Sequence, residues 1–183
     1  CGKANLIETI ANNTIVSNNT NASQGIGIGT STTAGFATNS PHLTATVTGN
    51  NVSQTDGNGI LAVARDSSGG ILDVSIKNNT VAAPLTGVRQ GIRVDAGNSG
   101  GDNDVCLDIS GNTSAPSVGQ PAALGIGIRK QGTSTTVNAF GIEGMAATTS
   151  PGVEAFVTGQ NPAGGGTLLI SATSGFSNCS SAP

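Results

Sequence analysis

The sequence contains no tryptophan and no tyrosine, and aromatic residues make up only 2% of its 183 positions. Charged residues account for 9%, and there is one histidine. A net charge of only −3 argues against ordinary disorder, which needs high net charge as well as low hydrophobicity. The pI is near 4.8, so the chain lacks the excess of basic residues that is typical of nucleic-acid-binding proteins. No apolar run approaches the roughly 20 residues of a membrane span, so we expect neither a nucleic-acid partner nor a transmembrane segment.

A six-residue phrase occurs four times in the sequence. In each copy an apolar residue is followed by polar residues that include asparagine. The copies are Ile10–Ile15, Val47–Val52, Ile76–Val81 and Ile109–Ser114. A second phrase follows each copy, at Gly25–Ile28, Gly59–Val63, Gly91–Val94 and Gly125–Ile128. Repetition at a period near 30 residues, without a helical phrase inside it, indicates one coil of a β-solenoid.

Apolar residues alternate inside these phrases, as in Ile26 and Ile28 or Ile92 and Val94. A period of two is the signal of a β-strand with one buried face. A single coil cannot bury its inward row alone, so the four copies must stack at the spacing of neighbouring strands. The sequence therefore predicts an all-β fold in which Ile10, Val47, Ile76 and Ile109 form one continuous inner stripe.

The bend in each copy contains asparagine, which tolerates left-handed backbone angles and bonds neighbouring amides. When coils stack in register, equivalent asparagines can bond one another as an amide ladder, at a net of about 1 kcal/mol per bond. We predict such a ladder from Asn13, Asn50, Asn79 and Asn112 and interpret these residues as scaffold rather than ligand-binding groups.

The repeat changes after residue 137, which predicts coils with loop insertions over residues 1–137 and a C-terminal cap over residues 138–183. The cap is expected to contain strands at 138–142 and 167–171 and a short helix at 150–159. Ser150 is the expected N-cap, Pro151 the first helical residue and Gly159 the stop. Three of the four phenylalanines lie in this region, as expected for a segment that covers the last coil.

Three cysteines in a chain so poor in charge favour an oxidising exterior. A disulfide between Cys106 and Cys179 would tie the tail to the coils, leaving Cys1 as a tether, an intermolecular bridge or a buried free thiol. The chain opens at Cys1 without methionine. We interpret it as a processed or excised part of a longer protein, either a lipoprotein lipidated at Cys1 or a fragment of a large secreted protein.

Few residues have the chemistry of a functional site. His42 follows a proline in a predicted loop, where a surface position is expected. Asp102 and Asp104 lie in a glycine-rich loop that resembles part of a Ca²⁺ site, the only cofactor that the sequence raises. No catalytic residue is assigned.

A sparse charged stripe is predicted along the second phrase, from Arg65, Arg93, Asp95 and Arg129. Glycoside hydrolysis needs two carboxylates that converge to within roughly 9.5 Å. Asp66 and Asp95 are the candidates near this stripe, but neighbouring arginines explain both as surface ion pairs. No tryptophan or tyrosine is present to stack on a sugar.

The two phrases together resemble the repeats of right-handed parallel β-helix proteins of the pectate-lyase-like fold, and the segment from Asp104 to Asn161 is similar to the C-terminal end of very large bacterial secreted or surface proteins. The resemblance implies a right-handed parallel β-helix. It does not imply one function, because lyases, hydrolases, adhesins and fibre proteins all have this fold.

We therefore predict a structural or adhesive extracellular segment that stacks on or terminates a cell-surface fibre. Its expected partners are copies of itself or adjoining coils, with surface glycans as a further possibility. Thr44, Thr46 and Thr48 alternate along one predicted strand, and such a row of threonines is the sequence feature that favours a binding or adhesive surface. The alternative is a β-helix protein that binds or degrades polysaccharide.

Overall fold

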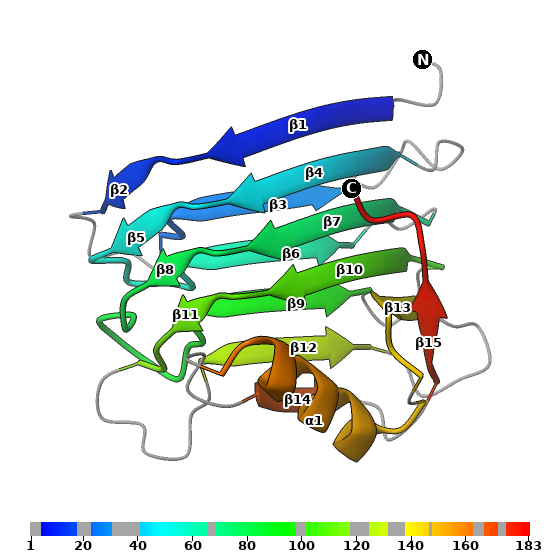
Figure 1. The fold of residues 1–183 in the computed structure, drawn as a ribbon. Coiled ribbons are helices and arrows are strands. Elements are labelled where there is room, and N and C mark those ends of the chain that lie inside the picture. Colours follow the sequence, from blue (N-terminus) through cyan, green and yellow to red (C-terminus); the bar gives the residue numbers. More distant parts are fainter. Residues whose placement is uncertain are drawn as a thin grey trace.

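The computed structural model describes residues 5–17, 23–30, 41–65, 69–97, 102–117, 125–131, 138–146, 148–162, 167–171 and 175–183. Within these ranges the strands form three all-parallel sheets, and one helix precedes the last two strands. The chain is a parallel β-solenoid of about four turns (Figure 1). The fold class predicted from the repeats is thus confirmed.

Each of the first four coils contributes one strand to each sheet. The front sheet contains β1 (Asn5–Ala11), β4 (His42–Thr48), β7 (Ile71–Lys77), β10 (Asp104–Ser110), β13 (Ala139–Glu143) and β15 (Phe176–Cys179). The short sheet contains β2 (Thr14–Val16), β5 (Asn51–Ser53), β8 (Thr80–Val81) and β11 (Thr113–Ser114). The rear sheet contains β3 (Ile26–Thr30), β6 (Ile60–Ala64), β9 (Ile92–Ala96), β12 (Ile126–Lys130) and β14 (Thr167–Ser171).

The winding is right-handed. In Figure 1 the front strands run to the left, the chain turns at the short sheet, and the rear strands return to the right while the chain descends. This is the hand that parallel strands joined by a crossover almost always adopt. On the front sheet the coils stack in register, because the pairing from β1 through β4 and β7 to β10 contains no shift. The last pair of the rear sheet, β12 and β14, shifts its register between Ile128 and Arg129.

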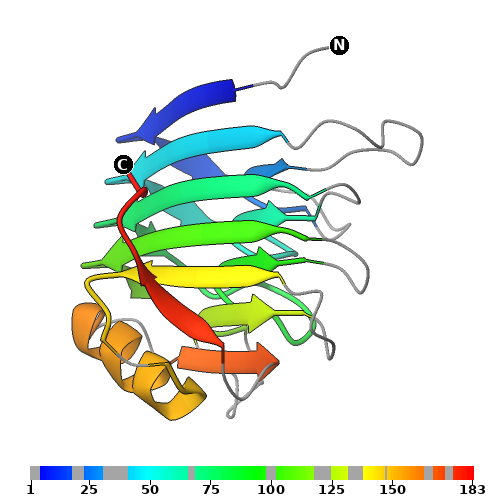
Figure 2. The same cartoon turned by 90° about the vertical axis from the view of Figure 1, so that its right-hand side faces the viewer.

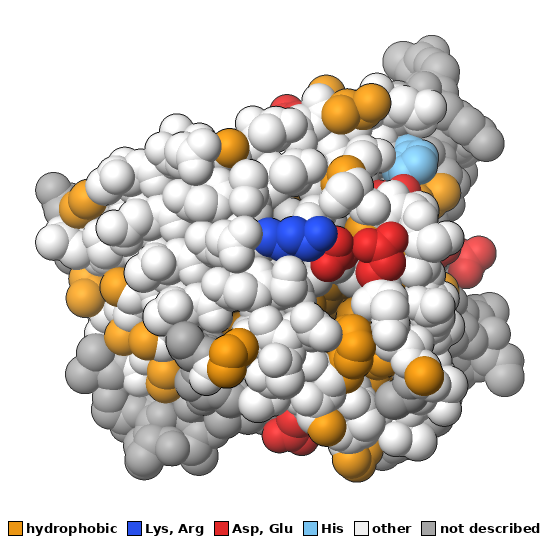
Figure 3. Space-filling model, in the orientation of Figure 1, with side chains coloured by type: hydrophobic (Ala, Val, Ile, Leu, Met, Phe, Trp, Pro, Cys, Tyr) orange, Lys and Arg blue, Asp and Glu red, His pale blue; other side chains and the backbone are white. Residues whose placement is uncertain are grey.

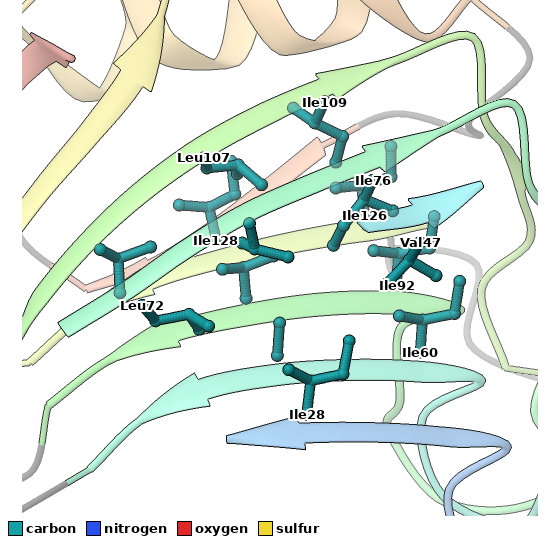
Figure 4. Packing of buried hydrophobic residues seen from close by; sticks show 14 of the residues in the cluster. Ile28, Val47, Ile60, Leu72, Ile76, Ile92, Leu107, Ile109, Ile126 and Ile128 are labelled. Carbon is teal, nitrogen blue, oxygen red and sulfur yellow. The ribbon is translucent and has the colours of Figure 1, made fainter. Parts of the chain in front are cut away.

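The core is a set of columns that run through the coils. Ile10, Val47, Ile76 and Ile109 are paired in register, as predicted, and the last three are buried. A second column on the rear sheet contains Ile26, Ile60, Ile92 and Ile126. Figure 4 shows the two sets of side chains interdigitating between the sheets. Each fully buried aliphatic side chain contributes about 1.5–3 kcal/mol, so the stacked columns are the main source of stability.

The C-terminal end of the stack is covered by α1 (Ser150–Gln160), which buries Val153 and Val157 against the last coil (Figure 2). The predicted helix position is right, but its predicted caps are wrong. Thr149 is the N-cap and makes no side-chain capping bond, while Gly159 lies inside the helix and Asn161 ends it. The Asn161 amide serves the ladder, which fixes where the helix stops.

The strand predicted at 138–142 is β13, one residue later, and it is not the last strand of the front sheet. β15 pairs in parallel with β13 and was not predicted. Phe176 of β15 packs edge-on against Phe140 of β13, with ring centroids 5.8 Å apart. The tail then runs back along the stack toward the N-terminal coils (Figures 1 and 2).

Candidate functional site

The four predicted ladder asparagines lie in one column on the inner side of the bends. From Asn50 onward, each Oδ1 accepts a hydrogen bond from the backbone N–H and from the side-chain amide of the preceding asparagine. For Asn50 and Asn79 these bonds measure 2.9 and 3.0 Å, and for Asn79 and Asn112 both measure 3.0 Å. Asn161 continues the column at the end of α1 and accepts from Asn112 at 3.0 and 2.9 Å.

The residue before each ladder asparagine adopts a left-handed backbone. Asn12, Gly49, Asn78 and Gly111 have φ values of 57°, 65°, 55° and 68°. Only glycine and asparagine adopt this conformation routinely, which explains why the repeated phrase has Asn-Asn or Gly-Asn at these positions. The column is scaffold: its amides are bonded to one another and to backbone carbonyls, so it offers no surface to a ligand.

The predicted disulfide is present between Cys106 of β10 and Cys179 of β15, with a Cα–Cα distance of 5.8 Å. The two strands are not neighbours, because β13 lies between them. The bridge crosses β13 at Gly141, which pairs with Cys106. A Cβ at Gly141 would lie 2.6 Å from Cys179 Cβ and 2.9 Å from its Sγ. Glycine at position 141 therefore leaves the space that the disulfide occupies.

Replacing Gly141 with alanine should hinder this disulfide, because the added methyl group meets the bridge closer than any ordinary contact. We expect incomplete oxidation and a larger fraction of chains with the Cys106 and Cys179 thiols free. Thiol titration of denatured, unreduced protein measures this directly. Gly27→Ala is the matched control, since a Cβ there meets nothing within 4 Å. Equal thiol content in both variants would contradict the role given to Gly141.

The tail beyond the disulfide is fastened to the outer face of the front sheet. Ser181 Oγ donates to Asp73 Oδ1 at 2.6 Å, and His42 Nε2 lies 2.6 Å from Asp73 Oδ2. His42 is the first residue of β4, so its predicted place in a loop is wrong. Because Asp73 stands between the histidine and the serine, these residues do not form a nucleophilic triad, in which histidine must touch the hydroxyl.

A second group on this face joins three strands: Lys77, Asp108 and Glu143. Lys77 forms an ion pair with Asp108, which also hydrogen-bonds Glu143. Desolvation and the nearby Asp108 charge raise the pKa of Glu143, and Lys77 opposes this shift. Figure 3 shows a basic group beside acidic groups over the middle of the front face. The ion pair and the hydrogen bond between neighbouring strands are sufficient to explain this cluster structurally.

The largest concentration of charge lies on the outer face of the rear sheet. Asp95 is fully buried and is bonded by three arginines. Its Oδ1 accepts from Arg93 Nε at 2.9 Å and from Arg129 Nε at 3.1 Å. Its Oδ2 accepts from Arg65 Nη2 at 2.5 Å and from Arg129 Nη2 at 2.7 Å. The predicted stripe is therefore one compact cluster. The prediction that Asp95 belongs to a surface pair is wrong.

The remaining predicted site residues are not brought into a cluster of this kind. Asp102 and Asp104 lie at the start of β10, where desolvation and the charges of Asp73 and Asp102 raise the pKa of Asp104. The described residues contain no group of three or more His, Cys, Asp or Glu side chains placed to hold a metal ion. Asp66 and Cys1 lie outside the described residues, so their predicted roles remain predictions.

Together the register, the ladder and the core define this chain as a parallel β-solenoid with a helical cap. No family model, no curated protein and no solved structure matches it. Among the residues that the structure describes, no helix has the length and apolar character needed to cross a membrane.

Proposed function

We propose that this chain is a structural segment of an extracellular β-solenoid that ends a stack of coils at its C-terminal side and receives a further coil at its N-terminal side. The observation that carries the proposal is the difference between the two ends of the stack. Helix α1 lies over one end, whereas the strand β1 at the other end has exposed apolar side chains and is covered by no helix among the described residues.

The C-terminal end is closed in three ways. The α1 helix buries Val153 and Val157 over the last coil. Asn161 supplies the last acceptor of the ladder, so that Asn112 is not left with unpaired donors. Gly111 N–H donates to the Gln160 carbonyl at 2.9 Å. The last strands of the three sheets, β15, β11 and β14, are each paired on one side only, but α1 lies over this end of the stack and hinders the addition of another coil.

The N-terminal end is different. Among the described residues β1 pairs only with β4, so its other edge carries unpaired backbone groups. Leu6, in the column that continues as Leu43 and Leu72, is 51% exposed, and Ile7 is 80% exposed. Apolar side chains along an open strand edge favour addition of another strand.

Glu8 determines which coil can add. It pairs with Ala45 in an inward column whose later members, Val74 and Leu107, are fully buried. An inward-pointing charge on an edge strand is a known protection against unselective pairing. Burying it without a cation costs several kcal/mol. A second copy would place Glu8 against Glu8, so we infer that the natural occupant is a coil carrying lysine or arginine at this position.

Replacing Glu8 with valine should release self-association. We expect the parent chain to remain monomeric at tens of micromolar and Glu8→Val to form a concentration-dependent dimer, measured by light scattering coupled to size exclusion. Glu154→Val removes an exposed charge from the capped end and should stay monomeric. If Glu8→Val also stayed monomeric, the open edge would not be a stacking surface and the proposal would fail.

An extracellular location is supported by the disulfide, because such bridges persist in oxidising compartments. The alternative function, cleavage of polysaccharide, would draw on Asp108 and Glu143. Their direct hydrogen bond leaves no room for a glycosidic bond between them, whereas hydrolysis uses carboxyl groups roughly 5–9.5 Å apart. This geometry favours the structural function over hydrolysis.

A further inference from the structure

The cluster of Arg65, Arg93, Arg129 and Asp95 on the rear sheet contains three positive charges and one negative charge. Asp95 accepts four hydrogen bonds, two on each oxygen, and has no capacity for more. Among the described residues it is the only acid paired with these arginines. The group therefore has a surplus of two positive charges that the described part of the chain does not neutralise.

The three guanidinium groups are held close together by their shared partner. Arg93 and Arg129 side chains are only 14% and 16% exposed, so water screens their mutual repulsion poorly. Desolvation lowers the pKa of Arg129, and the charges of Arg93 and Arg65 lower it further, while Asp95 opposes them. Arg65, at 40%, is the most accessible of the three and forms the outer edge of the cluster.

Two polar atoms on this face are buried without a partner. One is Arg65 Nε, a donor inside the cluster itself. The other is Gln90 Oε1, an acceptor that lies over Gly127, 3.2 Å from where a Cβ would be. Gly127 is paired with Arg93, so the Gln90 amide lies beside the arginines. Buried unpartnered polar atoms are rare in folded proteins, and each one calls for an explanation. Arg65 Nε is a donor that an anion can satisfy, whereas Gln90 Oε1 is an acceptor and gives no support to an anion site.

Asp95 holds the three arginine side chains in positions from which they can bind a further anion. It fixes each guanidinium by one or two bonds, and each guanidinium has donors beyond those that Asp95 uses. Arginine in such a fixed fork recognises the oxygens of planar or tetrahedral anions through paired hydrogen bonds. A surplus of two charges matches a doubly charged group better than a single carboxylate.

We propose that this cluster is a binding site for a tetrahedral dianion, a sulfate or phosphate group. The ligand's oxygens accept from Arg65, Arg93 and Arg129, and its charge neutralises the surplus that Asp95 leaves. The group is either a free ion or an ester carried on a larger molecule such as a sulfated glycan. The site lies on the flank of the solenoid, so it operates independently of whether coils add at β1.

Titration of the folded chain with sodium sulfate, at ionic strength held constant with sodium chloride, tests the site by calorimetry and by thermal melting. We expect saturable binding of sulfate and of inorganic phosphate. Arg65→Gln and Arg93→Gln should each weaken binding at least about tenfold. Arg89→Gln, which removes a partly exposed positive charge outside the cluster, should change affinity less than twofold.

Asp95→Asn provides a second measurement if the arginine variants fold poorly. It raises the surplus from two charges to three, so sulfate should raise its melting temperature more than that of the parent chain. Dextran sulfate against unsulfated dextran separates an ester from a free ion. No saturable sulfate binding, an equal loss in Arg89→Gln, or an adventitious response equal to that of chloride would each overturn the proposal.

Discussion

Asn79→Ala should lower the free energy of unfolding by about 3–4 kcal/mol, because it breaks the ladder at its centre. The Asn79 amide is buried and donates to the Val47 and Lys77 carbonyls and to Asn112 Oδ1. Its Oδ1 accepts from the Asn50 backbone and side chain. Alanine removes these five bonds and leaves the buried Asn50 backbone N–H without its acceptor. Urea unfolding followed by circular dichroism measures the change.

Two further variants separate the ladder from mere loss of a side chain. Asn51→Ala removes an exposed asparagine one position from the ladder and should change stability by less than about 0.5 kcal/mol. Asn79→Asp keeps the shape and the acceptors but, when ionised, cannot donate, so it should be destabilised at neutral pH. Equal stabilities for Asn79→Ala and Asn51→Ala would show that the amide bonds contribute nothing net.

The parts of the fold that sequence reasoning predicted are those that repeat. An apolar residue and an asparagine recur in the other coils at the spacing of Ile76 and Asn79, and in-register pairing places equivalent residues of neighbouring coils beside one another. Four copies of one phrase are therefore enough to predict both the column of apolar side chains and the asparagine ladder. The helix at 150–160 was located by its local signals, but its ends were not, since Asn161 is at once the C-cap of the helix and the last acceptor of the ladder.

What the sequence did not predict depends on single positions without a copy in other coils. The sequence predicted that Arg65, Asp95 and Arg129 lie on one face, but not that Asp95 is buried there with arginines from the coils on either side bonded to it. Glu8 lies in a column that is apolar in the other coils. Its proposed role in selecting the next coil follows from its position on the terminal strand β1, which only the structure shows. β15 lacks the repeated phrase because it returns to the front sheet from beyond the cap.

Removing the disulfide should have an effect comparable to breaking the ladder. Cys106 and Cys179 are 73 residues apart in sequence, and a cross-link that closes so long a loop restricts the unfolded chain by about 2–4 kcal/mol. The double variant Cys106→Ala/Cys179→Ala should lose about this amount in urea unfolding. Both proteins in this comparison carry Cys1→Ala, so that the Cys1 thiol cannot exchange with the Cys106–Cys179 disulfide. A loss below about 0.5 kcal/mol would contradict the expectation.

The disulfide also determines where the molecule opens first. Without it, β15 is held by its pairing with β13, by the packing of Phe176 on Phe140 and by Ser181 on Asp73. All of these lie at the end of the chain, where few contacts oppose local opening. In the double variant we expect hydrogen exchange to accelerate in β15 well before it accelerates in β7. Adding Phe176→Ala should release the tail and expose Asp73, whereas uniform acceleration in both strands would show that the bridge acts only through global stability.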